Sequence, residues 1–169
     1  MLLVITQQVI QPQKHSKDIK MIVRLADKHD IPHIQRLLVL FQAESPHKKY
    51  GAPDADYLNR ILTRCLLGGV IVVAQDNKQI VGTLISIIQS DLWFPNLQRL
   101  IELAWYVEKD YRNTTAGSRL FNEYIKQANM LKDDSRIENY SISLMKNSPD
   151  INLTKRGFSL EERTFVSGV

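Results

Sequence analysis

The run Ile101-Glu-Leu-Ala-Trp-Tyr-Val107 and the segment after it constrain this chain more than any other stretch of its sequence. Apolar, β-branched and aromatic residues at 101–107 predict a buried strand. From residue 117 the pattern changes to the three-and-four spacing of a helix, carried by Leu120, Phe121, Tyr124, Ile125 and Ala128. The short basic loop between them therefore leads from a strand into a helix N-terminus. Because the first amides of a helix have no intrahelical partner and lie at the positive end of its dipole, this loop predicts an anion site that suits a pyrophosphate.

The rest of the chain alternates between β-rich runs and helical patterns. Further strands are predicted at 21–24, 70–74, 80–88 and 140–144, with a last strand at 161–166. Apolar residues at helical spacing predict helices that start at Asp30 and at Asp54 or Asp56, and a short helical piece near 149–156. The expected order is β-α-α-β-β-β-α-β-α-β.

Length and composition indicate one globular domain that is large enough to bury a core, with 169 residues of which 44% are hydrophobic. No apolar run approaches the roughly 20 residues of a membrane span, so no membrane partner is expected. Met1–Ile10 lacks the basic start of a signal peptide. The single cysteine, Cys65, excludes an internal disulfide and fits a reducing compartment, so we expect a cytoplasmic protein.

Residues 1–20 read as a separate polar arm that precedes a domain at 21–169. We expect a terminus without fixed structure, with an added strand against the sheet or a second copy as the alternative. The arm holds +2 of the net charge of +4, from Lys14, Lys17 and Lys20 against Asp18. The +2 that is left for the domain argues against nucleic acid as a partner, and basic residues near a phosphate-rich cofactor explain it equally well.

The loop after the 101–107 strand resembles the acyl-CoA-binding motif of the GCN5-related N-acetyltransferases (GNAT), written Arg/Gln-x-x-Gly-x-Gly/Ala. Arg112 takes the first place and Gly117 the last, while Thr115 stands where the first glycine is expected. The predicted element order is similar to that of the family from about residue 21 to 166. The resemblance implies an α/β (α+β) GNAT fold with a mixed, mostly antiparallel sheet of six to seven strands, flanked by about four helices.

Three short motifs resemble an uncharacterised branch of this family that is often found in phage and prophage genomes. They are Ala-Glu-Ser-Pro at Ala43 to Pro46, Glu-x-x-Trp-x-Val at Glu102, Trp105 and Val107, and Gly157-Phe158 followed by Glu162. This resemblance implies a phage protein that works in the host cytoplasm.

Family membership implies acetyl-CoA as the cofactor and an amine, on a small molecule or a protein, as the acceptor. The pantetheine arm pairs in such proteins with the fourth strand, here the main chain of Trp105, Tyr106 and Val107, where it parts from the fifth strand at a bulge. The pyrophosphate is expected beside Arg112, over Asn113, Thr114, Thr115, Ala116, Gly117 and Ser118. Because threonine disfavours the positive φ that glycine allows, either the loop follows another path, with a Thr114 or Thr115 hydroxyl on a phosphate, or binding is weakened.

Glu102 is the expected general base, because the attacking amine must be neutral and the family often places a glutamate before the bulge. The alternative is an exposed strand residue or the partner of an arginine; Glu161 and Glu162 are weaker candidates. Many members also carry a tyrosine acid four residues before the glycine of the Gly-Phe pair, but Leu153 stands at that place. The substitutes left open are a water, Tyr140, Ser141 and Ser143.

The acceptor pocket is expected between the loops at 45–57 and 91–95. There Tyr50, Trp93 and Phe94 either form an aromatic floor or pack the loops. His29 and His33 are four residues apart, but no metal site is expected because His29 falls before the start of the predicted helix.

Two other functions stay open. One is a binding module that keeps the fold without catalysis, motivated by Thr115 and Leu153. The other is an acetyltransferase toxin acting on aminoacyl-tRNA, which would need a basic face such as Lys48, Lys49, Arg60 and Arg64. Dimers are common in the family, so a homodimer also stays open, although no residue pattern specifies an interface.

Overall fold

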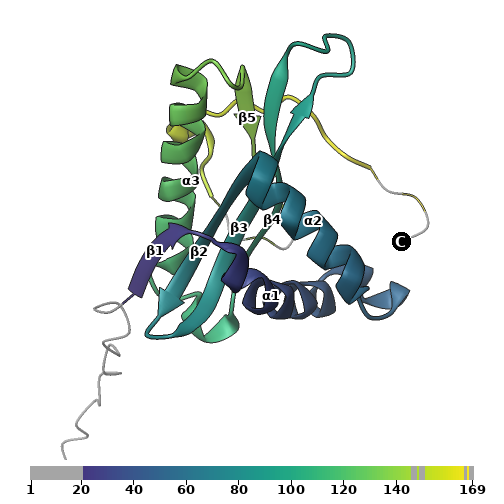
Figure 1. Ribbon diagram of the computed structural model, residues 1–169, viewed down its shortest axis with the longest axis vertical. Helices are drawn as coiled ribbons and strands as arrows, with labels where there is room; N and C mark the ends of the chain where they lie inside the picture. The colour runs from purple at the N-terminus through teal and green to yellow at the C-terminus, as the bar shows by residue number, and fades with distance from the viewer. Residues whose placement is uncertain (1–20, 146–147, 149–150, 166, 168–169) are drawn as a thin grey trace, which may run out of the picture.

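A single curled sheet forms the centre of the computed structural model, which describes residues 21–145, 148, 151–165 and 167 (Figure 1). Its described strands lie in the order β1 (Met21–Leu25), β2 (Gly69–Asp76), β3 (Gln79–Ser90), β4 (Gln98–Val107) and β5 (Asn139–Ser141). β1 to β4 pair antiparallel, and β5 joins β4 in parallel. Helices α1 (Ile31–Glu44) and α2 (Ala55–Gly68) cover one face, and α3 (Ala116–Asp133) covers the other.

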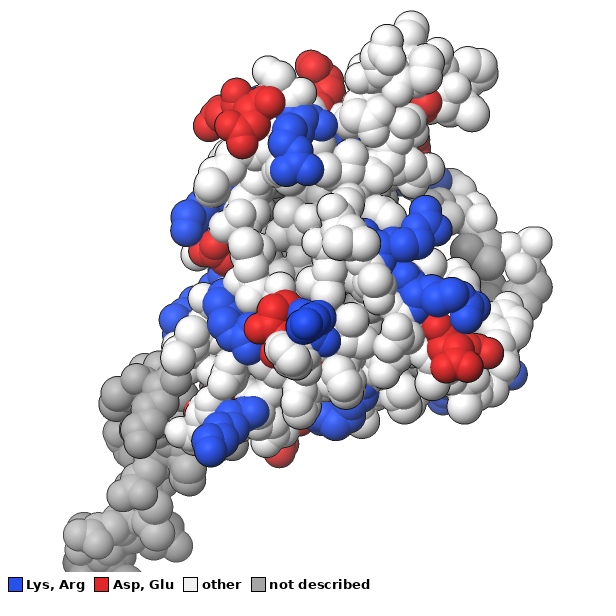
Figure 2. All heavy atoms as spheres, in the orientation of Figure 1, with Lys and Arg blue, Asp and Glu red and all other residues white. Residues whose placement is uncertain are grey.

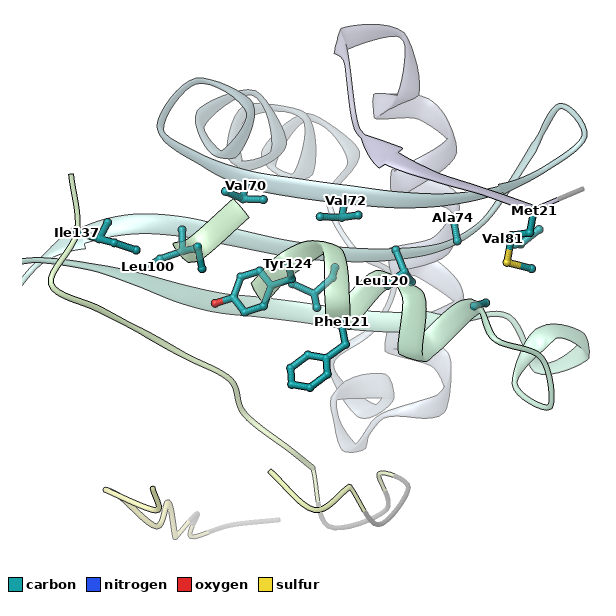
Figure 3. Packing of buried hydrophobic residues seen from close by; sticks show 13 residues of the cluster. Met21, Val70, Val72, Ala74, Val81, Leu100, Leu120, Phe121, Tyr124 and Ile137 are labelled. Carbon is teal, nitrogen blue, oxygen red and sulfur yellow. The ribbon is translucent and has the colours of Figure 1, made fainter. Parts of the chain in front are cut away.

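The two faces of the sheet carry separate hydrophobic clusters. β2 and β3 contribute to both, which explains why their sequences are continuous apolar runs rather than alternating ones. The cluster under α3 includes Val72, Leu84, Leu100, Leu120, Phe121 and Tyr124 (Figure 3). The cluster under α1 and α2 includes Ile34, Leu37, Leu62, Cys65, Ile71, Val73 and Ile85.

The predicted helix starts are correct, but one cap is not the expected residue. Asp54 caps α2, since its Oδ1 accepts a hydrogen bond from the Tyr57 amide at 2.6 Å. Asp30 precedes α1 without a side-chain cap, and it is Asp27 that accepts from the His29 amide and caps the short 3-10 turn Lys28–Asp30. The Asp30 carboxylate instead accepts hydrogen bonds from Arg24 on β1.

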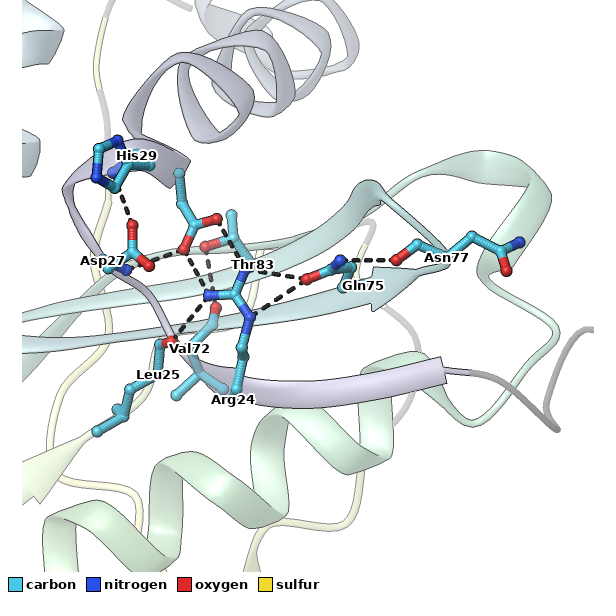
Figure 4. Close-up of polar contacts among 9 residues, drawn as sticks. Arg24, Leu25, Asp27, His29, Val72, Gln75, Asn77 and Thr83 are labelled. Carbon is cyan, nitrogen blue, oxygen red and sulfur yellow. Dashed lines mark hydrogen bonds and ion pairs between the residues drawn. The ribbon is translucent and has the colours of Figure 1, made fainter.

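A bidentate ion pair ties β1 to the start of α1 (Figure 4). Both terminal guanidinium nitrogens of Arg24, NH1 and NH2, donate to the Asp30 carboxylate, at 2.6 and 2.9 Å. Arg24 also donates to Gln75 Oε1 on β2. The Arg24 hydrogen bond outweighs burial and lowers the pKa of the Asp30 carboxyl. This pair therefore locks the first helix onto the edge of the sheet.

The described part of the chain after α3 differs from the sequence-based prediction. The strand expected at 140–144 ends at Ser141. Of the helical piece expected at 149–156, residues 149 and 150 lie outside the described residues, and the described remainder holds one 3-10 turn, Thr154–Arg156. The strand expected at 161–166 is wrong over 161–165, where no strand forms, and residue 166 lies outside the described residues. The segment cannot bury a face, because Phe165 is its one large apolar side chain among those described and is 91% exposed.

The expected α+β fold class is confirmed, although the described residues contain five strands and three α-helices instead of six to seven and about four. The predicted arm at 1–20 lies outside the described residues. Within the described part of the chain, no helix has both the length and the apolar character that crossing a bilayer demands.

We expect Asp30→Asn to lower the free energy of unfolding at pH 7 by about 2 kcal/mol, because charge-assisted hydrogen bonds to Arg24 are lost. The folded-state pKa of Asp30 is lowered from its ordinary 3.8, so the wild-type advantage is present above that pH and is lost as the pH falls through the lowered folded-state pKa. Urea unfolding at pH 7 and near pH 3 measures both effects. Asp56→Asn, at an exposed position in the first turn of α2, is the control; equal losses in the two variants would contradict the prediction.

Candidate active site

A β-bulge in β4 determines which side chains reach each face of the sheet. The β3–β4 register passes from Ala104 opposite Ile85 to Glu102 opposite Ser86, so Leu103 is the extra residue. The bulge reverses the alternation of the strand. Leu100 lies in the cluster under α3, whereas Ala104 lies in the cluster under α1 and α2. The bulge that the family resemblance implied is therefore present, directly after Glu102.

β4 and β5 part at the same point. Their pairing covers only residues 99–101 against 139–141, and no described strand pairs with 102–107 on that side. The Glu108 amide donates to the Val81 carbonyl on β3. Because antiparallel residues alternate in direction, the main chains of Trp105 and Val107 then face the open edge and that of Tyr106 faces β3. Two of the three predicted strand residues thus present main chain to the gap.

Glu102 is buried at the end of this gap. It is 9% exposed, and its Oε2 accepts a hydrogen bond from the Ser143 amide at 3.1 Å. Burial raises the pKa of the Glu102 carboxyl to about 7, although the Ser143 amide acts in the opposite direction. Among the described residues no arginine or lysine forms an ion pair with it. Glu102 is thus neither an exposed strand residue nor the partner of an arginine.

Arg112 is held at the open edge of β4 by contacts within the protein. Its Nε donates to the Val107 carbonyl at 2.8 Å, and its NH2 group donates to Glu44 Oε2 at 2.8 Å. Its guanidinium also lies over the Tyr106 ring, 5.2 Å from the centroid, and the Tyr106 hydroxyl donates to Glu44 Oε1. Arg112 is therefore ordered beside the loop, with its charge partly balanced by Glu44.

Glu44 at the end of α1 has the opposite environment to Glu102. Burial acts to raise the pKa of its carboxyl, but hydrogen bonds from Tyr106 and Arg112 outweigh it and leave the pKa lowered. The residue falls within the Ala-Glu-Ser-Pro motif, yet 68 positions separate it from Arg112. No local sequence signal indicates this pairing.

The loop at 112–117 needs no glycine at position 115. Thr115 has φ −80°, so a β-branched residue is unstrained there. The Thr114 hydroxyl donates to the Tyr111 carbonyl at 2.6 Å and accepts from the Ala116 amide, so its proton points into the loop itself. The threonine that replaces the first glycine of the family motif therefore causes no backbone strain.

The start of α3 is open above its first turn. Thr115 provides no side-chain cap, and a Cβ at Gly117 would meet only Trp105, at 4.0 Å. First-turn amides beneath an uncrowded surface are what a phosphate requires. Arg119, by contrast, donates to the Met21 carbonyl and ties α3 to β1. The loop therefore fits a pyrophosphate through its main chain, with Arg112 as the nearby cation.

The aromatic residues predicted for the acceptor pocket are exposed and are not brought together. Tyr50 lies in the 3-10 turn Pro46–Tyr50 after α1, and Trp93 and Phe94 lie at the tip of the β3–β4 hairpin. Figure 1 places this tip and that turn at opposite ends of the molecule. The Trp93 and Phe94 amides donate to Asp91 Oδ1, which shapes the tip. A shared aromatic floor is not formed in this arrangement.

The Tyr140 phenol, one of the substitutes left open for the missing tyrosine, is bonded within the protein. Leu153 packs against the cluster under α3. The Tyr140 hydroxyl donates to Asn129 Oδ1, and the Ser141 carbonyl accepts from the Tyr124 hydroxyl. Two hydrogen bonds of this region could not be predicted from the sequence: the one from the Tyr124 hydroxyl to the Ser141 carbonyl and the one from the Ser143 amide to Glu102. Helical periodicity indicates only that Tyr124 faces the core.

This combination of a bulged fourth strand, a parting fifth strand and an open helix start agrees with sequence comparison. The model of the acetyltransferase (GNAT) family matches residues 34–158. The chain belongs to this family and is an N-acetyltransferase. No curated protein matches it in sequence.

Solved structures share the fold at low sequence identity. An acetyltransferase from Trypanosoma brucei is 18% identical, with a TM-score of 0.63 over 88% of this chain and 99% of that one. A possible acetyltransferase from Clostridium difficile 630 is 21% identical, with a TM-score of 0.61 over 88% and 97% of the two chains. An aminoglycoside acetyltransferase from an uncultured soil sample, solved with sisomicin, is 17% identical, with a TM-score of 0.63 over 89% and 97%. These likenesses establish the fold.

The raised pKa of Glu102 predicts a stability change with pH. The unfolded chain loses this proton near the ordinary pKa of 4.5 and the folded chain near 7. The folded state therefore binds more protons between these values, and the free energy of unfolding falls as the pH rises through the window. Glu102→Gln has no such proton. Between pH 4 and 8 its free energy of unfolding should therefore rise by about 3 kcal/mol relative to that of the wild type.

Denaturant unfolding across this range measures the difference. Glu138→Gln, at an exposed glutamate just before β5, should follow the wild type. A Glu102→Gln curve parallel to that of the wild type would show that the carboxyl titrates normally.

Proposed function

We propose that this protein transfers an acetyl group from acetyl-CoA to an amine by direct attack, with Glu102 as the general base. The observation that carries the proposal is a buried carboxylate at the bulge where β4 leaves β5, with a pKa raised to about 7. A base with a pKa near the working pH is both available and strong enough to accept a proton.

When bound, acetyl-CoA supplies a thioester whose carbon–sulfur bond breaks as the new carbon–nitrogen bond forms. Glu102 accepts the proton that the amine loses, directly or through a water. The Ser143 amide stabilises its negative charge before the transfer. Thiolate is a tolerable leaving group, so transfer does not require a tyrosine at position 153.

The donor would be held mainly by main chain. Trp105 and the Val107 amide offer the open edge of β4 to the pantetheine arm, and the first turn of α3 offers the amides of Gly117 and Ser118 to the pyrophosphate. Arg112 would add a charge-assisted contact beside them. The Ala116 amide is already bonded to the Thr114 hydroxyl, and the Val107 carbonyl to Arg112. Hydroxyl donation from Thr114 forms no part of the proposal, since that proton is used within the loop.

The acceptor we propose is a small or protein-borne amine rather than aminoacyl-tRNA. Basic and acidic side chains are interspersed over the face seen in Figure 2, without the continuous basic surface that a nucleic acid requires. One structural neighbour is an aminoglycoside acetyltransferase, which makes aminoglycosides a sensible first class of amine to assay. A phage origin has the support of the three short motifs alone.

Isothermal calorimetry with acetyl-CoA tests the donor site. We expect binding, weakened about tenfold or more in Arg112→Ala because a charge-assisted contact is worth roughly 1.5–3 kcal/mol. Arg119→Ala is the matched control, because this arginine lies on the same helix start but bonds to Met21. If acetyl-CoA gives no heat at millimolar concentration, the proposal fails; if both variants weaken binding equally, Arg112 has no special role.

Release of CoA thiol with a panel of aminoglycosides, polyamines and peptide amines tests turnover. For an accepted amine, kcat/KM should rise with pH through about 7, as Glu102 loses its proton. Glu102→Gln should lose this rise and about 100-fold or more in rate, whereas Glu138→Gln should keep both. Donor binding without turnover on any amine would favour the non-catalytic binding module, and an unchanged rate in Glu102→Gln would exclude Glu102 as the base.

A further inference from the structure

Tyr124 on α3 carries a buried phenol that binds the end of β5. Its side chain is fully buried in the cluster under α3 (Figure 3). Its hydroxyl donates to the Ser141 carbonyl at 2.9 Å. Ser141 is the last residue of β5, and opposite Ile101 it is the last one paired with β4. The phenol therefore holds the chain at the point where the two strands part.

Two residues further along, the same segment contacts Glu102 through the Ser143 amide, 3.1 Å from Oε2. The segment is thus fixed at one end by a side chain of α3 and at the other by the carboxylate. β5 itself contributes only three residue pairs to its attachment. Ile142, between these two residues, packs against the cluster under α3, and the Tyr124 phenol supplies the side-chain hydrogen bond that sets the register of the Ser143 amide with Glu102.

We propose that Tyr124 is a positioning residue for Glu102: by holding the Ser141 carbonyl, it fixes the segment 141–143 so that the Ser143 amide donates to the carboxylate. The inference rests on the proposed role of Glu102 as the base. It assigns to Tyr124 no contact with either substrate.

The groups around Glu102 leave the Ser143 amide as the main stabiliser of its negative charge. Tyr124 faces Glu102 from α3, and Tyr140 on β5 packs edge-on against Tyr124. Burial raises the pKa of both phenols, so they stay neutral where Glu102 titrates. β3 places Ser86 opposite, but its hydroxyl donates to the Val70 carbonyl. Since no described cation pairs with Glu102, the Ser143 amide is the main dipole that stabilises its charge.

Tyr124→Phe removes the hydroxyl and keeps the ring, and Tyr140→Phe is the matched control. Tyr140 packs edge-on against Tyr124 at 6.0 Å, but its hydroxyl donates to Asn129 and not to the segment 141–143. Two NMR measurements on the whole protein without substrates provide the readout: amide hydrogen exchange at Ser143 and the carbon-13 titration of the Glu102 carboxyl. Thermal unfolding verifies that both variants are folded.

We expect Ser143 exchange to be about tenfold faster in Tyr124→Phe, the effect of one lost hydrogen bond. The pKa of Glu102 should rise further, because the amide that lowers it is loosened. Tyr140→Phe should match the wild type in both. Wild-type behaviour of Tyr124→Phe, or equal changes in the two variants, would overturn the inference. Retained turnover in Glu102→Gln would remove Glu102 as the base, whereas the Ser143 exchange rate would still decide whether Tyr124 positions the segment.

Discussion

The extra residue in β4 is the constraint on which the rest of the site depends. If Leu103 were a regularly paired strand residue, the alternation would continue past Glu102 and Ala104 would fall on the face that α3 covers. With Leu103 as the extra residue, Leu100 packs under α3 while Ala104 and Tyr106 pack under α1 and α2. The bulge thus lets β4 contribute side chains to both hydrophobic clusters. It also places the Glu102 carboxylate beside the point where β5 leaves β4.

Two glutamates show how the fold sets ionisation through surroundings rather than residue type. Glu44 has a guanidinium and a phenol as hydrogen-bond donors, and its pKa is lowered. Among the described residues Glu102 has only the Ser143 amide as a donor, and burial raises the pKa of its carboxyl to about 7. The first is suited to hold Arg112 beside the helix start. The second is suited to exchange a proton near neutral pH.

Elements up to residue 133 could be predicted because each carries a local signal: β-branched runs, helical spacing, or a cap such as Asp54. Glu102 could be singled out through its place before the bulge. Its contact with Ser143 could not, since 41 residues separate the two. The strand predicted at 161–166 does not form over 161–165, because the one large apolar side chain of that stretch, Phe165, is exposed and gives it no face to bury. Thr115 would strain a loop that follows the family motif, because the motif has a glycine there and glycine allows positive φ. The backbone at Thr115 has negative φ, so no glycine is required.

The brevity of β5 has a consequence for the chemistry of its neighbour. Three residue pairs hold it to β4, whereas β3 and β4 are paired along nearly their whole lengths. Sheet edges with few pairs open locally at much smaller free energies than the sheet as a whole. Each such opening would let water reach Glu102 and return its affinity for a proton toward that of an ordinary glutamate. Proton affinity at this position is therefore a property of the closed strand, and breathing of the edge would modulate it without disturbing the four-stranded sheet beneath.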